Sequence, residues 1–134
     1  MLGAAICPSG QHQKPLILKK KNKPTLSVGL AQIAPVWLDR DATLAKVADW
    51  VGRAADRDCE LVVFGEALVP GYPFWVERTD GARFESDLQK KLYGHYVEQA
   101  VSPTDGDLDA IRELARERDI AVYLGIMELS LIHI

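Results

Sequence analysis

The sequence predicts an α/β protein with a parallel sheet, because short apolar runs alternate with stretches whose apolar residues recur at helical spacing. The apolar runs are nearly continuous, which is typical of strands that are buried on both faces of a parallel sheet. Apolar residues make up 48% of the 134 residues, enough for a buried core. The chain is therefore one modest domain or part of a larger one.

Three apolar runs are expected to form the strands. The first is "LSVGLAQIA", residues 26–34, and Pro35 ends it because proline cannot donate to a sheet. The second is "ELVVF", residues 60–64, and the third is "IAVYLGIME", residues 120–128. Their order with the helices is strand, helix, strand, loop, helix, helix, strand.

Three amphipathic helices are expected between the strands. The first begins after Asp39 or Asp41, since either carboxylate can accept hydrogen bonds from the first turn. The second covers about residues 87–99, and the third lies within residues 102–119. The predicted inward residues are Leu44, Val47, Ala48, Val51 and Ala55 in the first helix, and Leu108, Ile111, Leu114 and Ala115 in the third.

Charge divides the chain into two unequal parts. Residues 1–24 carry five lysines and no acid, so the remainder holds a net charge of −8 within a total of −3. The first part is interpreted as a basic, disordered or spurious leader, with a targeting signal or basic arm as the alternative. Residues 25–128 are expected to form the domain. Their acidity argues against nucleic acid as a partner, and no apolar run is long enough to span a membrane.

The two cysteines do not indicate a disulfide framework or a metal site. Cys7 and Cys59 lie far apart and form no CxxC pair, which favours reduced thiols in a cytoplasmic protein. His95 has no Ser, Cys or second His at triad or metal spacing, so a structural role is favoured over a catalytic one.

A carboxylate directly follows the second predicted strand. Glu66 stands two residues beyond Phe64, and chemistry in open α/β sheets collects at the carboxyl ends of the strands. Partial desolvation by Phe64 and Leu68 would raise the pKa of Glu66 and suit it to act as a general base. The alternative is a structural glutamate that caps a loop or pairs with an arginine.

The loop "VPGYPFW" that follows is stiff and aromatic. Pro70 and Pro73 fix two backbone torsions, and Gly71 permits a turn. The flat apolar side chains that are candidates for a substrate-pocket wall are Tyr72, Phe74 and Trp75. The same aromatic residues would also suit a loop that only packs against the core. The residues alone thus predict an acid at a pocket edge, without naming its task.

These residues resemble the nitrilase branch of the carbon–nitrogen hydrolase superfamily. The similarity spans residues 26–128 and is most specific in "FGEALVPGYPFW", where a strand, a glutamate and a PGYP loop follow one another. The resemblance implies the N-terminal portion of a four-layer α-β-β-α sandwich. It also implies a Glu–Lys–Cys triad in which Glu66 is the general base, with a small nitrile substrate and no cofactor. The complete protein is expected to form homo-oligomers.

The lysine and the cysteine of this triad are expected downstream of the residues in hand. Cys59 opens the strand that leads to Glu66, so it lies at the opposite end of that strand. A strand rises ~3.3 Å per residue, which places Cys59 too far from Glu66 to replace the missing cysteine. Cys7 lies in the leader, and Lys90 and Lys91 fall in a predicted helix where solvated lysines are ordinary. The chain is therefore expected to be inactive by itself.

The last residues break the family pattern. Residues 129–134, "LSLIHI", can be encoded by a string that resembles a transposon end used as an adapter in DNA library preparation. They are interpreted as a non-native tail, and the chain as an incomplete reading of a nitrilase gene. The alternatives to a nitrilase are a cyanide hydratase or dihydratase, an amidase of the same superfamily, and a non-catalytic truncated product.

Overall fold

The structure, a computed structural model, describes residues 25–81 and 83–129. The expectations for the basic leader, residues 1–24 with Cys7, and for residues 130–134 of the tail lie outside the described residues. Leu129 is described, and its backbone N–H donates to the carbonyl of Val101 at 2.9 Å.

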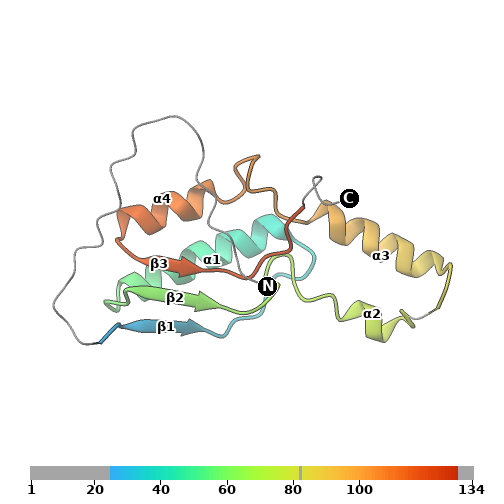
Figure 1. The fold of residues 1–134 in the computed structure, drawn as a ribbon, viewed down its shortest axis with the longest axis horizontal. Coiled ribbons are helices and arrows are strands. Elements are labelled where there is room, and N and C mark those ends of the chain that lie inside the picture. The colour runs from blue at the N-terminus through green and yellow to red at the C-terminus, as the bar shows by residue number, and fades with distance from the viewer. Residues whose placement is uncertain (1–24, 82, 130–134) are drawn as a thin grey trace.

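A small parallel sheet forms the centre of the fold, as the sequence predicted. Its strands are β1 (Val28–Ala31), β2 (Leu61–Phe64) and β3 (Ala121–Tyr123), in the order β1-β2-β3. β2 is the middle strand, and it pairs in parallel with both neighbours. The carboxyl ends of all three strands therefore lie at one edge of the sheet (Figure 1).

The first and third strands are shorter than predicted. The first pairs only as far as Ala31, opposite Phe64, because β2 then leaves the sheet as a turn. β3 stops at Tyr123, and two isolated bridges continue beyond it, from Ile126 to Val69 and from Glu128 to Val101. An apolar run indicates burial, whereas strand length also depends on how far the partner runs.

The predicted helices are all present. They are α1 (Arg40–Ala55), α3 (Asp87–Glu98) and α4 (Asp109–Glu117). Asp39 rather than Asp41 is the N-cap of α1, and its side chain accepts from the Ala42 N–H at 2.9 Å. The single-turn helix α2 (Trp75–Arg78) was not predicted, because four residues are too few to show a helical period.

Both α1 and α4 cover one face of the sheet (Figure 1). The buried stripe of α1 runs through Thr43, Val47, Val51 and Ala54. It meets the strand residues whose side chains point to the same side, and the cluster includes Ala31, Val62, Phe64, Leu68, Ile111 and Ile120. Burial of these side chains in one contiguous cluster is what orders the strands and helices together.

The other face of the sheet remains open among the described residues. Leu30 is 80% exposed, Tyr123 is 66% exposed and Val28 is 43% exposed. These residues alternate with the buried ones, so they belong to the face opposite α1 and α4. Parallel sheets are covered on both faces in stable folds, and this one is covered on one.

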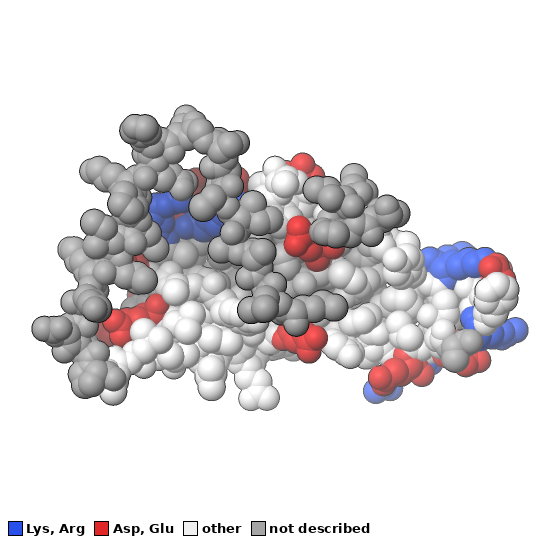
Figure 2. All heavy atoms as spheres, in the orientation of Figure 1, with Lys and Arg blue, Asp and Glu red and all other residues white. Residues whose placement is uncertain are grey.

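The pair α2 and α3 extends away from the sheet (Figure 1). Trp75 and Tyr96 join the two helices edge to face, with ring centroids 6.2 Å apart. At the end formed by these helices, Lys and Arg are interspersed with Asp and Glu rather than gathered into a basic face (Figure 2). One such neighbouring pair is Lys90 with Glu85.

Candidate active site

The turn after β2 carries Glu66 at the carboxyl edge of the sheet, where the sequence placed it. Gly65 leaves the strand, and residues 66–68 form a turn in which Ala67 has a positive φ of 46°. The side chain of Glu66 is exposed. The expected desolvation by Phe64 and Leu68 is therefore wrong for the described residues, because both neighbours point into the core at 3% and 5% exposure.

The segment that follows β3 packs its backbone against the turn that carries Glu66. A Cβ atom on Gly125 would lie 2.3 Å from the Gly65 carbonyl oxygen and 2.8 Å from the Glu66 Cα. The Val69 N–H donates to the Gly125 carbonyl at 3.3 Å, and the Met127 N–H donates to the Val69 carbonyl at 2.8 Å. Only a residue without a side chain permits this approach of two backbones.

The loop after β1 packs against the PGYP loop. Gly71 has a φ of +125°, and a Cβ there would lie 2.6 Å from Cδ1 of Trp37. The Leu38 N–H donates to the Pro70 carbonyl at 2.9 Å, and Trp37 Nε1 donates to the Tyr72 carbonyl at 3.4 Å. Gly71 is thus required both by its conformation and by the lack of space beside it.

Aromatic rings stack at this contact and remain partly open. Trp37 lies on Phe74 with ring centroids 4.6 Å apart and an interplanar angle of 21°. The Arg78 guanidinium carbon lies 6.0 Å from the centroid of the Phe74 ring. Trp37 is 38% exposed, Phe74 41% and Tyr72 56%, so these three residues form an accessible aromatic cluster. We call Trp37, Tyr72 and Phe74 the aromatic cluster below.

Trp75, the third predicted wall residue, is buried, whereas the residues of the aromatic cluster are exposed. It is 5% exposed and packs against Tyr96, and its indole N–H finds no acceptor among the described residues. Burial of the Tyr96 hydroxyl raises the pKa of Tyr96, and the nearby Tyr72 raises it further. A contact of Trp75 with substrate stays a prediction that the geometry does not test.

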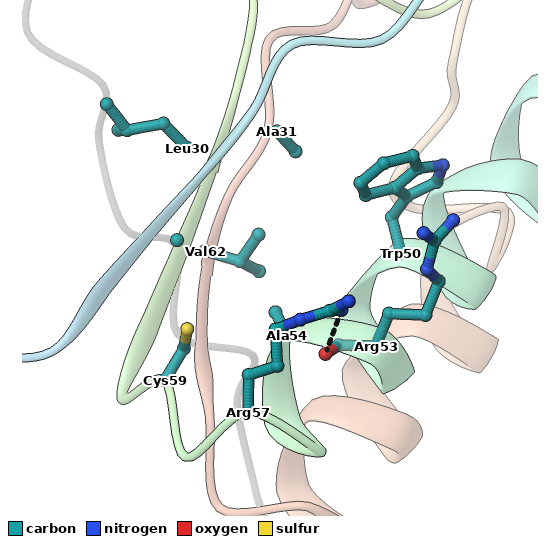
Figure 3. Close-up of a pocket in the computed structure, with 9 residues that line it drawn as sticks. Leu30, Ala31, Trp50, Arg53, Ala54, Arg57, Cys59 and Val62 are labelled. Atoms are coloured by element: carbon teal, nitrogen blue, oxygen red, sulfur yellow. Dashed lines mark hydrogen bonds between the residues drawn. The ribbon is translucent and has the colours of Figure 1, made fainter.

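Cys59 lies at the amino end of β2, the end opposite Glu66. Its sulfur would be 3.3 Å from a Cβ on Gly29, and it borders a pocket of about 310 Å³ between the sheet and α1 (Figure 3). The pocket is lined by Gly29, Leu30, Ala31, Trp50, Arg53, Ala54, Arg57, Cys59 and Val62. Cys59 therefore cannot reach Glu66, as the strand length predicted.

The other residues weighed from the sequence lie on α3. Lys90 pairs with Glu85, and Lys91 is exposed. His95 Nδ1 lies 3.5 Å from a Glu98 carboxylate oxygen one turn further along the exposed side of the same helix. These contacts are local to the helix.

Metal and membrane chemistry receive no support from the described residues. Within residues 25–81 and 83–129, no group of three or more His, Cys, Asp or Glu side chains is placed to hold a metal ion. None of the helices in this part of the chain is long and apolar enough to cross a bilayer. What the edge does offer is an accessible carboxylate that can take up a proton.

Two residues of this region were missed by sequence reasoning. Trp37 follows the first strand in "APVW", and Gly125 sits within the third apolar run "YLGIM". Each acts through a contact with a residue far away in the chain, Phe74 for Trp37 and Glu66 for Gly125. The available signals were a tryptophan two residues after a proline that ends a strand, and a glycine inside a strand-like run, which marks a close backbone approach.

Fold and site together define a class: an α/β protein with a carboxylate at the carboxyl end of its middle strand, beside an aromatic loop. The carbon–nitrogen hydrolase family model matches residues 27–131. The chain belongs to the carbon–nitrogen hydrolase family, and its relatives are those of the nitrilase branch.

Three relatives show the range of the similarity. An arylacetonitrilase of Arthroderma benhamiae is 30% identical over 78% of this chain and 29% of its own length. A cyanide hydratase of Botryotinia fuckeliana is 32% identical over 74% of this chain and 25% of its own. An aliphatic nitrilase of Rhodococcus rhodochrous is 32% identical over 78% of this chain and 27% of its own. The chain thus spans less than a third of the length of these relatives.

Proposed function

We propose that the chain is the N-terminal part of a nitrilase, which hydrolyses an organic nitrile to a carboxylic acid and ammonia. The observation that carries this proposal is the position of Glu66, exposed on the turn after β2 and backed by Gly125. Nitrile substrates are supported by the relatives, which include an arylacetonitrilase and an aliphatic nitrilase. The aromatic cluster beside the turn suits the organic group of such a substrate.

In this proposal Glu66 moves protons for a cysteine supplied further along the complete protein. The carboxylate takes the thiol proton, and the thiolate attacks the nitrile carbon to give a thioimidate. Water adds, ammonia leaves, and a thioester remains. A second water, activated by Glu66, releases the acid and the thiol. A downstream lysine stabilises the negative charge that develops on the attacked group.

The complete protein is proposed to be an α-β-β-α sandwich that assembles into homo-oligomers in the cytoplasm, without a cofactor. The exposed sheet face of Val28, Leu30 and Tyr123 supports a second sheet packed there. Cys59 forms no disulfide within residues 25–81 and 83–129, and a reduced thiol there would suit the proposed cytoplasmic compartment. Size-exclusion chromatography with light scattering on the complete protein tests the assembly.

Sequencing unfragmented DNA of the gene beyond codon 129 is the first test. A reading frame that continues to a lysine and a cysteine supplies the partners that Glu66 needs. A stop codon directly after residue 134 would instead favour the non-catalytic truncated product and end the enzymatic proposal for this chain.

Ammonia release by the complete protein is the second test, with Glu66→Gln as the decisive variant. Loss of a general base costs about 10²- to 10⁴-fold in rate, and we expect a loss in this range. The matched control is Glu113→Gln, an exposed glutamate on α4, which should leave the rate unchanged. A Glu66→Gln protein that keeps its rate within a few-fold would rule out the base role.

A cyanide hydratase is the second candidate, since one relative carries that name. Such an enzyme adds one water and releases an amide, whereas a nitrilase releases ammonia and an acid. Product analysis with cyanide and with an organic nitrile separates the two. Turnover of amides but of no nitrile would indicate an amidase of the same family.

A further inference from the structure

We infer that Trp37 is a positioning residue for the loop of residues 71–74, and that the Trp37–Phe74 stack favours nitriles with an aromatic group. The second half of this inference rests on the proposed function. The first half concerns only how one loop holds another, and it can be tested without turnover.

The contact between Trp37 and the PGYP loop is made in three ways. The indole ring stacks on Phe74 at 4.6 Å, and its N–H donates to the Tyr72 carbonyl at 3.4 Å. The Gly71 backbone fits against the indole edge with no room for a side chain. One side chain thereby contacts three of the four residues 71–74, so its removal would release the loop at several points.

Trp37 is itself held in place by α1. Thr43, fully buried in the first turns of that helix, accepts from the Val36 N–H at 3.1 Å. The Thr43 hydroxyl lies 2.9 Å from the Val36 carbonyl and 2.7 Å from the Asp39 carbonyl, so it has acceptors on both sides. The Asp39 N–H closes the loop by donating to the Val36 carbonyl at 3.0 Å. These hydrogen bonds hold the backbone on either side of Trp37, at Val36 and Asp39, against the start of α1.

The stacked pair still offers an apolar surface to a ligand. As whole residues, Trp37 is 38% exposed and Phe74 is 41% exposed. In the chain, Trp37 follows β1 and Phe74 follows β2, as Glu66 does. Stacked or edge-to-face aromatic contacts add about 0.5–1.5 kcal/mol beyond area burial, which a small aliphatic nitrile cannot gain. The pair is therefore expected to discriminate by substrate shape rather than to take part in the chemistry.

Amide hydrogen exchange in the complete protein tests the positioning. Trp37→Ala should increase exchange at residues 72–75, while Trp37→Phe keeps a stack on Phe74 and should stay near wild type. Trp50→Ala is the matched control, because Trp50 lies on α1 with Arg53 4.0 Å over its ring and borders the pocket between the sheet and α1. Unchanged exchange at residues 72–75 in Trp37→Ala would overturn the inference.

Steady-state kinetics test the discrimination, with an arylacetonitrile and acetonitrile as the two substrates. Trp37→Ala should raise KM for the aryl substrate by about 3- to 10-fold relative to acetonitrile, the factor that corresponds to one aromatic contact. Phe74→Leu keeps an apolar side chain without the stack and should reproduce the change, and Trp37→Phe should restore most of the preference. Equal changes for both substrates would overturn the discrimination.

Turnover and hydrogen exchange together distinguish a failure of the proposed function from a failure of this inference. If the wild-type complete protein hydrolyses no nitrile, the nitrilase proposal and the discrimination fall together. The exchange measurement still decides the positioning, because it compares folded proteins without substrate. Should Trp37→Ala not fold, Phe74→Leu provides the same exchange comparison at residues 72–75.

Discussion

Glu66 depends for its position on a residue that has no side chain. The backbone of Gly125 approaches the turn so closely that even a methyl group would meet the Gly65 carbonyl and the Glu66 Cα. A contact between two backbones cannot be relieved by rotating a side chain. The geometry of the candidate base is therefore decided jointly by the turn after β2 and the segment after β3.

Gly125→Ala should disturb both stability and activity in the complete protein. Overpacking of this kind costs about 1–3 kcal/mol, and the displaced turn should lower the rate of ammonia release. Gly94→Ala is the control, since nothing lies within 4 Å of its Cβ position on α3 and the change should stabilise by about 0.5–1 kcal/mol. Urea midpoints that change alike in both variants would contradict the account.

Tyr96 provides a prediction for alkaline pH. Burial raises its pKa above the ordinary value of 10.0, so the folded protein keeps this proton to higher pH than the unfolded chain does. The contribution of this group to stability is complete below about pH 10 and falls as the pH rises through the folded pKa. Urea midpoints of the complete protein from about pH 8 to about pH 11 should show this loss.

Two variants on α3 isolate the effect. Tyr96→Phe should flatten the alkaline part of the stability profile, because it removes the buried hydroxyl. Tyr93→Phe removes the hydroxyl of a tyrosine that is 59% exposed on the same helix, and it should keep the wild-type slope. A Tyr96→Phe protein with an unchanged slope would assign the alkaline dependence to another group.

Helix α1 links the core to the candidate site at the scale of an element. Its interior stripe packs on the sheet, while its N-terminal end holds the loop that carries Trp37. Arg40 in the first turn contacts Asp107 at 3.1 Å and donates to the Ala100 carbonyl at 3.2 Å, which connects α1 to the segment between α3 and α4. The pKa of Arg40 is raised, mainly because its side chain donates a hydrogen bond to Asp41. Partial burial of Arg40 acts in the opposite direction and lowers the pKa.

Asp39→Ala should destabilise the complete protein by about 1 kcal/mol, the usual cost of losing an N-cap. Asp41→Ala should cost less than about 0.5 kcal/mol, because its carboxylate is 82% exposed and its ion pair with Arg40 is a surface pair. Denaturant midpoints of the two variants provide the measurement. Equal losses would show that Asp41 shares the capping role.

The sequence predicted elements better than it predicted contacts. Helical spacing identified α1 and α4, and continuous apolar runs identified all three strands, because both patterns are local consequences of burial. The helix α3 was predicted only as part of a more polar stretch. Strand ends were overextended, since a ladder stops where its partner stops. The stack of Trp37 on Phe74 could not be predicted, because no local pattern indicates which residue a loop will meet.

The candidate site was predicted to a similar degree. The placement of Glu66 at the carboxyl edge followed from one strand end and was confirmed. Its expected desolvation was wrong for the described residues, because Glu66 is exposed while Phe64 and Leu68 are buried in the core. Whether a turn residue is buried depends on which elements pack over it. The residues next to it in the chain do not show which elements those are.

At the scale of the whole molecule, the open sheet face dominates the behaviour of the chain. Leu30 is 80% exposed and Tyr123 is 66% exposed, and both alternate along their strands with residues of the face that α1 and α4 cover. The outer edge of β1 is also unpaired among the described strands. An open apolar face with a free strand edge favours association between molecules.

Residues 1–134 expressed alone should therefore be poorly soluble or form aggregates, whereas the complete protein should not. Size-exclusion chromatography with light scattering, followed by thermal melting, provides the comparison. A monodisperse sample of residues 1–134 that melts cooperatively would show that the open face does not need a cover.

The contact between Trp37 and the PGYP loop also limits how this family can be recombined. The two loops lie on either side of α1 and β2 in the chain, yet Gly71 fits only against the edge of the indole. A crossover placed between them joins a tryptophan from one parent to a loop shaped for another residue. Chimeric libraries should therefore inherit residues 35–75 as one block.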